Sequence, residues 1–163
     1  MAENIDTEST RVVIGPDGIE DKLPAAVIDT SFFAAFLLGT DDEEGYEEAR
    51  NEIEKIVSSG GIIFVPNLFW YEIGNVLLNA SKPRKDGSPS RISVSDANDI
   101  LYDLKQLPVA TEDQRDLDII MRIKTLASEY GLSFYDASYL ELSRRFDLPL
   151  LTFDTDLKNA SKG

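Results

Sequence analysis

Two acidic residues that follow apolar runs are the first candidates for chemistry in this sequence. Asp29 follows the apolar run 25–28, and Asp154 follows a second, largely apolar run, 148–153. Short apolar runs of this kind are typical of strands buried in a parallel sheet, and the carboxyl ends of such strands meet where these folds bind ligands. Because Asp also caps helices, it stays open whether Asp29 only caps the helix that is expected after it.

Two further carboxylates fall on predicted helices. Glu72 belongs to an apolar helix expected over 67–80, and a carboxylate buried there needs a partner, a metal ion or a proton. Asp136 falls in the first turn of a later helix, where the helix dipole favours a negative charge. Because strands alternate with helices along the chain, we expect right-handed crossovers and a parallel sheet, which allow the four acids to converge.

The composition narrows the chemistry. The chain has 163 residues with no His and no Cys, and its 30 acidic and 16 basic side chains give a formal charge of −14 at pH 7. Serine–histidine catalysis, imidazole metal ligands, zinc–thiolate sites and thiol catalysis are therefore excluded. A hydrolase of this composition has to use carboxylates together with a hard metal ion.

Several carboxylates cannot all ionise side by side without a cation. Oxygen-only ligand sets select Mg²⁺ or Mn²⁺, and Mg²⁺ keeps water molecules that can attack a phosphate. One such ion can activate the water, and two can hold both sides of an in-line displacement. The acids therefore predict metal-dependent phosphodiester hydrolysis, with one or two ions left open and with Asp156 as a further candidate ligand.

Basic residues are concentrated in one loop, 82–91, directly after the predicted Glu72 helix. Its basic side chains are those of Lys82, Arg84, Lys85 and Arg91. A chain of this net charge repels nucleic acid at long range, so contact with phosphates has to come from a local basic patch. We expect RNA contact at this loop, with a solvated linker as the alternative.

Length and composition indicate one domain behind an extension. Residues 1–24 are polar and rich in turn residues, so we expect a flexible segment or a small hairpin there, and the domain over 25–163. No apolar run reaches the ~20 residues of a membrane span, and a secretory signal pattern is not seen. The lack of Cys is compatible with a reducing compartment, and we expect a cytoplasmic protein.

The four acids lie in four short segments. These are Val27-Ile28-Asp29-Thr30-Ser31, Val65-Pro66 with Glu72-Ile73-Gly74-Asn75-Val76-Leu77, Leu132-Ser133-Phe134-Tyr135-Asp136-Ala137-Ser138-Tyr139-Leu140, and Leu150-Leu151-Thr152-Phe153-Asp154-Thr155-Asp156-Leu157. In order and spacing they resemble the PIN domain, in particular the VapC-type toxin ribonucleases. The resemblance implies a three-layer α/β/α sandwich with a central parallel sheet, and Mg²⁺- or Mn²⁺-dependent endoribonuclease activity on structured RNA such as tRNA. It also implies a homodimer and a small antitoxin that inhibits the enzyme.

The resemblance also implies roles for single residues. It makes the four acids the catalytic and metal-binding quartet, and it gives supporting roles to Ser31, Asn75 and Thr152. The N-terminal extension, the acidic composition and the basic loop depart from the family pattern. They remove no catalytic position, but they leave the RNA target open.

Two other functions remain as alternatives. A Toprim-type phosphoryl-transfer site would pair Glu72 with Asp154 and Asp156, and it would require Glu72 at the end of a strand. A non-catalytic PIN-like module would bind RNA or protein, with acids that bind metal weakly or not at all. Metal titration distinguishes this module from the nuclease.

The first helix offers a surface for the expected antitoxin. Its apolar residues Phe32, Phe33, Phe36 and Leu37 exceed what one short helix buries in its own core, so part of them is expected to line a groove for an amphipathic partner helix. A guanidinium from such a partner would suit an acidic crevice, because it makes paired bonds to carboxylates. We expect it to point at Asp29 and Asp154.

Overall fold

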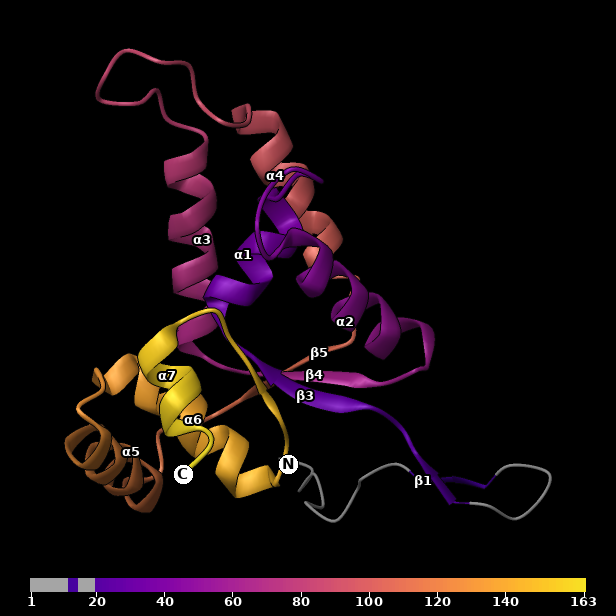
Figure 1. Cartoon of the computed structure of the whole chain (residues 1–163), viewed down its shortest axis with the longest axis vertical. Helices are drawn as coiled ribbons and strands as arrows, with labels where there is room; N and C mark the ends of the chain where they lie inside the picture. Colours follow the sequence, from indigo (N-terminus) through magenta and orange to yellow (C-terminus); the bar gives the residue numbers. More distant parts are fainter. Residues whose placement is uncertain (1–11, 15–19) are drawn as a thin grey trace, which may run out of the picture.

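The computed structural model describes residues 12–14 and 20–163, and a four-stranded parallel sheet lies at its centre (Figure 1). The strands are β3 (Ala25–Ile28), β4 (Ile62–Pro66), β5 (Val109–Glu112) and β6 (Leu150–Leu151). Their spatial order is β5-β4-β3-β6, and each neighbouring pair is parallel. The predicted parallel sheet is therefore confirmed, and the strands that precede Asp29 and Asp154 are neighbours.

Helices cover both faces of the sheet. They are α1 (Thr30–Leu38), α2 (Tyr46–Ser58), α3 (Leu68–Ala80), α4 (Val94–Leu104), α5 (Leu117–Tyr130), α6 (Phe134–Phe146) and α7 (Thr155–Ala160). In Figure 1, α1 to α4 lie on one side of the sheet, and α5, α6 and α7 lie on the other. This arrangement is the predicted three-layer α/β/α sandwich.

The last strand is shorter than the run 148–153 that predicts it. Only Leu150 and Leu151 pair with β3. Pro149 has no N–H to donate to the ladder, although its carbonyl accepts a bond from Val27 N–H at 2.9 Å. After Leu151 the chain turns toward α7, so the residues before Asp154 leave the sheet and become available to the site.

The aromatic side chains of α1 belong to the core. Phe32 and Phe33 are 1% and 0% exposed. The ring of Phe32 stacks on Phe153, and that of Phe33 contacts Phe69. Burying such a ring is worth roughly 1.5–3 kcal/mol, and it is this packing that holds α1 against its neighbours. Of the four apolar residues expected to supply part of a partner groove, Phe32 and Phe33 therefore do not contribute, whereas Phe36 and Leu37 are only partly buried.

Helices α3 and α4 form an arm that extends away from the sheet (Figure 1). The loop between them, at the far tip of the arm, contains the basic segment 82–91. Ser93 ends this loop by accepting a bond from Asp96 N–H at 3.0 Å, while the Asp96 carboxylate accepts one from Ser93 N–H at 2.9 Å. This capping box fixes the start of α4.

An antiparallel strand pair precedes the sheet. It consists of β1 (Val12–Ile14) and β2 (Glu20–Lys22). Residues 1–11 and 15–19 lie outside the described residues, so the flexible segment or small hairpin expected over 1–24 stays a prediction. The division of the chain at residue 24 stays a prediction. Within the described ranges, no helix is both long and apolar enough to cross a membrane.

Candidate active site

Asp29 lies where β3 ends and α1 begins, and its side chain is only 6% exposed. It occupies the N-cap position of α1, yet its carboxylate makes no cap hydrogen bond. Instead Oδ2 accepts bonds from the hydroxyls of Ser31 at 2.6 Å and Thr152 at 2.8 Å. The capping interpretation is therefore wrong for the Asp29 side chain, which is held across the sheet by the segment after β6.

Glu72 reaches the same region from α3, the helix that follows β4. Its side chain is partly buried, and Oε2 accepts two hydrogen bonds, from Thr30 Oγ1 at 2.8 Å and from the Tyr139 hydroxyl at 2.6 Å. These two hydroxyl oxygens lie 2.8 Å apart, and Tyr139 is completely buried. Glu72 is thus fixed by α1 and α6 together.

The pKa of Glu72 responds to two other acids of the site. Burial raises the pKa of Glu72 above its ordinary value, and the negative charges of Asp29 and Asp136 raise it further. The hydrogen bonds from Tyr139 and Thr30 act in the opposite direction, because they stabilise the ionised carboxylate. The pKa of Tyr139 is itself raised, chiefly by burial and then by its bond to Glu72, so this phenol acts as a neutral donor.

Asp136 lies in the first turn of α6. Its Oδ2 accepts a bond from Ser133 Oγ at 2.6 Å, and its N–H donates to the same hydroxyl at 3.0 Å. Ser133 is the N-cap of α6, as expected of a helix that starts directly before Asp136. The carboxylate is partly buried.

Asp154 is exposed and caps α7, since Oδ1 accepts a bond from Leu157 N–H at 2.8 Å. Its own N–H donates to Thr152 Oγ1 at 3.0 Å, and the same Thr152 hydroxyl donates to Asp29. Thr152 therefore links the acids at the ends of β3 and β6. Asp154, and not Asp29, is the acid whose side chain caps the helix that follows it.

The four carboxylates share one pattern. In each, one oxygen is held by hydrogen bonds while the other makes no hydrogen bond or ion pair to any residue that the structure describes. The free oxygens are Asp29 Oδ1, Glu72 Oε1, Asp136 Oδ1 and Asp154 Oδ2. Over residues 12–14 and 20–163, none of the four is paired with Lys or Arg.

This donor set suits a hard cation. Among the described residues no three acidic side chains stand close enough together to make a three-ligand metal site. Mg²⁺ does not need one, because it is usually bound through one or two carboxylates while water fills the other positions. Free carboxylate oxygens, mutual repulsion between Glu72 and its acidic neighbours and the lack of a paired cationic side chain fit such an ion.

The remaining predicted residues differ in whether they contact the acids. Ser31 and Thr152 contact Asp29 directly. Asn75 and Asp156 are exposed, and neither side chain makes a hydrogen bond to a described residue, so their roles stay predictions. In the basic loop, Arg91 is engaged, because its guanidinium bonds to Glu43 and to the carbonyl of Leu38.

Sequence reasoning missed the two hydroxyls that hold Glu72. Thr30 directly follows Asp29 and bonds to a different carboxylate. Tyr139 comes three residues after Asp136 on α6, a spacing that puts both on one helix face. That spacing marks Tyr139 as a neighbour of the site, but only the packing of α3 on α1 and α6 shows which acid it contacts.

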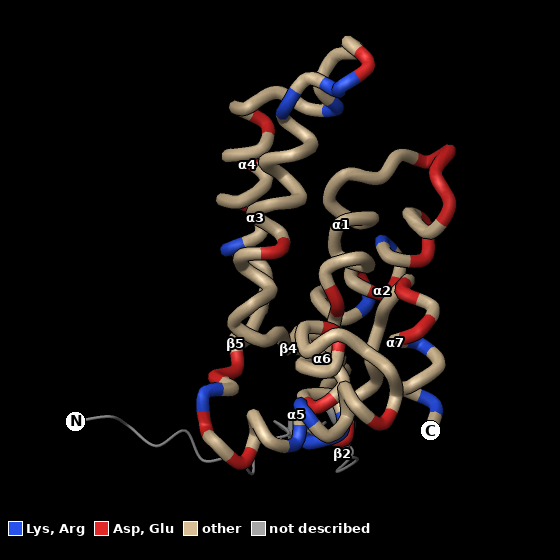
Figure 2. The backbone as a smooth tube through the Cα atoms, turned by 90° about the vertical axis from the view of Figure 1, so that its left-hand side faces the viewer, with Lys and Arg blue, Asp and Glu red and all other residues tan. Residues whose placement is uncertain are grey.

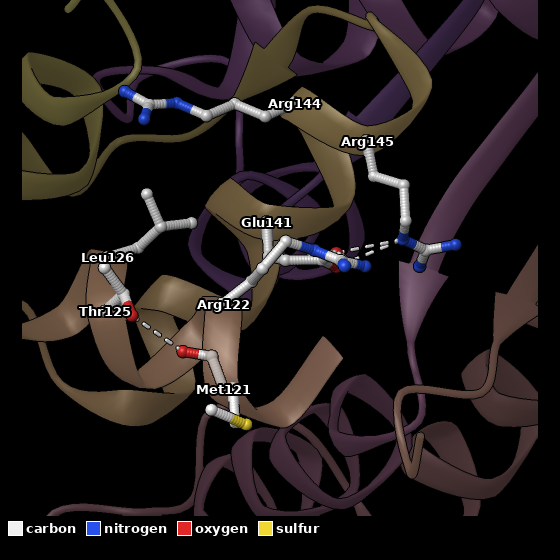
Figure 3. Close-up of a pocket in the computed structure, with 7 residues that line it drawn as sticks. All are labelled: Met121, Arg122, Thr125, Leu126, Glu141, Arg144 and Arg145. Atoms are coloured by element: carbon white, nitrogen blue, oxygen red, sulfur yellow. Dashed lines mark hydrogen bonds and ion pairs between the residues drawn. The ribbon is translucent and has the colours of Figure 1, made fainter. Parts of the chain in front are cut away.

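A second buried carboxylate lies elsewhere, between α5 and α6 (Figure 3). Glu141 is 2% exposed and borders a pocket of about 470 Å³. Arg122 bonds to its Oε1 at 3.2 Å and Arg145 at 3.0 Å. Gln114 donates to Oε2 at 3.0 Å, so this carboxylate is neutralised within the chain.

The fold and the acidic edge of the sheet define the class of this protein. The PIN domain family profile matches residues 26–163, which is most of the chain, and the chain therefore belongs to the PIN domain family. The family predicted from the four sequence segments is confirmed. Glu72 lies inside helix α3 rather than at the end of a strand, so the Toprim alternative does not fit.

Solved structures show the same fold. The VapC20 toxin of Mycobacterium tuberculosis, described as cleaving the sarcin–ricin loop, matches with a TM-score of 0.55 and 16% identity, over 83% of this chain and 94% of that one. PAE2754 from Pyrobaculum aerophilum matches with a TM-score of 0.55 and 23% identity, over 95% and 90% of the two chains. A comparison with curated proteins found no match.

Proposed function

We propose that this protein is a metal-dependent endoribonuclease and the toxin of a toxin–antitoxin pair. The observation that carries the proposal is the group formed by Asp29, Glu72 and Asp136, in which the charges of the two Asp side chains raise the pKa of Glu72 and no described Lys or Arg is paired with any of the three. A chain that keeps such a group at the carboxyl edge of a parallel sheet has a site for an external cation. PIN-family membership and the likeness to a ribonuclease toxin support the choice of RNA.

Each residue has a part in this activity. Asp29 Oδ1 and Glu72 Oε1 would hold Mg²⁺ or Mn²⁺, with Asp136 and Asp154 beside them. The bound ion supplies positive charge at the phosphate and a water of lowered pKa. Ser31 and Thr152 orient Asp29, and the hydroxyls of Thr30 and Tyr139 orient Glu72. Preorganised ligands of this kind save the free energy of ordering them when the ion and the RNA bind.

The basic loop is the proposed phosphate contact. Lys82 comes ten positions after Glu72, and at the helical rise this puts the loop about 15 Å from the acid along the arm. Lys82, Arg84 and Lys85 are exposed there, and Figure 2 shows blue segments at the tip of the arm. A phosphate several nucleotides from the cleaved bond would meet them. Replacing all three with Ala should weaken RNA binding and flatten its salt dependence while metal affinity stays unchanged.

Arg91 is the matched control for that loop. It is the fourth basic residue of the segment, but its guanidinium already bonds to Glu43 and Leu38. Arg91→Ala should therefore change the salt slope less than any of the other three substitutions. An unchanged slope in the triple variant would make the loop a linker.

A hollow of about 480 Å³ beside the site suits the antitoxin. It is lined by α1, by charged residues of the segment after α1, by Arg91 and by Val76 of α3. Ala34 and Leu38 follow Thr30 on one face of α1, and Val76 lies one turn beyond Glu72 on α3. The small side chain of Ala34 leaves room for an amphipathic segment that points a basic residue at Asp29. This surface replaces the one expected from Phe32 and Phe33. On the resemblance alone, we also propose a homodimer.

Co-purification tests the antitoxin proposal. A small protein encoded beside this chain should be retained by the wild type and lost by Ala34→Trp, which fills the hollow. The complex should bind Mn²⁺ more weakly than the free chain. If it binds Mn²⁺ as tightly and cleaves RNA as fast, inhibition by occupation of the site is wrong.

Cleavage of a pooled tRNA and rRNA preparation, with fragment ends mapped, tests the central proposal. The wild type should produce defined ends in Mg²⁺ or Mn²⁺ and none in chelator. Asp29→Asn should produce none under either condition. If the folded wild type binds metal but cuts nothing, the chain is a non-catalytic module and the proposed activity is wrong.

A further inference from the structure

The negative charge of the acidic site opposes the binding of RNA. Asp29, Glu72 and Asp136 repel RNA phosphates, and among the described residues no Lys or Arg bonds to them. The basic loop lies about 15 Å along the arm, beyond the Debye length at physiological salt. In the metal-free chain, the uncharged part of a nucleotide, its base, is therefore the part that can bind next to the cleaved bond. Bases bind by stacking on aromatic rings.

Tyr135 is placed for such a contact. It precedes Tyr139 by four residues on α6, so the two side chains lie on one face of the helix, about 40° apart. Tyr139 is the residue that contacts Glu72, and Asp136 lies about 60° to its other side. Tyr135 therefore lies about 6 Å along the helix from Tyr139, toward the start of α6, and next to Asp136 at the rim of the site.

The Tyr135 ring is open to solvent. The residue is 64% exposed, and its hydroxyl makes no hydrogen bond to any residue that the structure describes. An exposed tyrosine alone is ordinary. Tyr102 shows this, because it is 71% exposed on α4, on the other face of the sheet from α6 (Figure 1). The position of Tyr135 relative to Tyr139 and Asp136 is what distinguishes it.

We propose that Tyr135 stacks on the base of a nucleotide next to the cleaved phosphodiester. A base can stack on a side chain only when it is unpaired or splayed out of its helix. The Tyr135 contact therefore adds to binding only where the bases beside the cleaved phosphodiester are free, and not in a continuous duplex. This inference rests on the proposed ribonuclease function of the same site.

Binding in chelator tests the inference without cleavage. The full chain is titrated against a short single-stranded RNA that contains 2-aminopurine, whose fluorescence reports stacking. Tyr135→Ala should bind about tenfold more weakly than the wild type and lose the fluorescence change. Tyr135→Phe should retain both, because stacking needs the ring and not the hydroxyl. Tyr102→Ala, the matched control, should behave as the wild type, and the same RNA in a duplex should bind the wild type and Tyr135→Ala equally.

Two results would overturn the proposal. One is a loss in Tyr135→Ala no larger than that in Tyr102→Ala, and the other is an equal loss in Tyr135→Phe, which would make the hydroxyl the contact. Cleavage by the wild type in Mn²⁺ is measured in parallel. If the wild type cleaves and Tyr135→Ala cleaves the single strand as fast, only the stacking role fails, whereas a wild type that does not cleave contradicts the proposed function.

Discussion

Glu72 and Glu141 are both carboxylates withdrawn from solvent, but they differ in the groups that surround their charge. Glu141 receives two guanidiniums and an amide, so its charge is neutralised where α5 meets α6. Glu72 receives two neutral hydroxyls, and its charged neighbours are other acids. Because burying a charge costs free energy unless it is compensated, the first arrangement serves the fold. The second has a cost in the free protein that an external cation can offset.

The largest expected effect is on catalysis at the uncompensated group. Asp29→Asn removes a charged ligand of the metal ion. A bound ion stabilises the transition state by several kcal/mol, so its loss should lower kcat about a thousandfold or more. Stability in chelator should be unchanged or higher, because the substitution relieves repulsion with Glu72. The measurements are RNA cleavage in Mn²⁺ and thermal unfolding in EDTA. A much lower melting temperature of Asp29→Asn in EDTA would show that Asp29 stabilises the fold, as Glu141 does, and would contradict the difference proposed between them.

Glu141→Gln should have the opposite profile. The amide cannot neutralise Arg122 and Arg145, and breaking a buried ion pair in this way costs about 3 kcal/mol. Chemical denaturation measures this loss of stability. Mn²⁺ affinity of the folded variant should equal that of the wild type, so a large drop in affinity would connect the two regions and refute their separation.

Tyr139→Phe tests whether the hydrogen bonds to Glu72 orient it for metal binding. It removes one of the two donors to Oε2 and leaves the ring in place. Loss of such a supporting partner typically weakens metal binding about tenfold or more. Mn²⁺ binding by calorimetry measures this effect. Because a purely structural Tyr139 would change the melting temperature and not the affinity, equal Mn²⁺ affinities would remove its orienting role.

The smallest effect is on stability as a function of pH. Burial raises the pKa of Glu72 above its ordinary 4.5, so the unfolded chain releases this proton at lower pH than the folded chain does. In chelator, stability should therefore fall as pH rises from about 4.5 through the raised pKa. The free energy of unfolding of Glu72→Gln should lack this part of the decline. Identical pH profiles for the two proteins would show that Glu72 is not strained by its surroundings.

Local patterns in the sequence predict the sheet and the family. Apolar runs before Asp29 and Asp154 mark the strands, and β3 and β6 are indeed paired as neighbours in one parallel sheet. The start of α6 follows from Ser133, which caps it. These features depend on spacing along the chain, which the sequence displays directly.

Contacts between distant segments could not be predicted in the same way. Nothing in the Glu72 helix shows that its carboxylate bonds to Thr30 and Tyr139, and nothing near Glu141 shows that Arg122 reaches it from α5. The burial of Phe32 and Phe33 likewise follows from how α1 packs between its neighbours. Side-chain direction and helix packing determine these contacts, and the order of residue types does not contain them.

The most direct test is the change in unfolding stability that Mn²⁺ causes in three proteins. A ligand at a hundred times its Kd stabilises the folded state by about 2.7 kcal/mol. The wild type and Glu141→Gln should both gain this increment, despite their different starting stabilities, and Asp29→Asn should gain little or none. An equal gain in Asp29→Asn would contradict the account, because the cation would then bind somewhere other than the uncompensated acids.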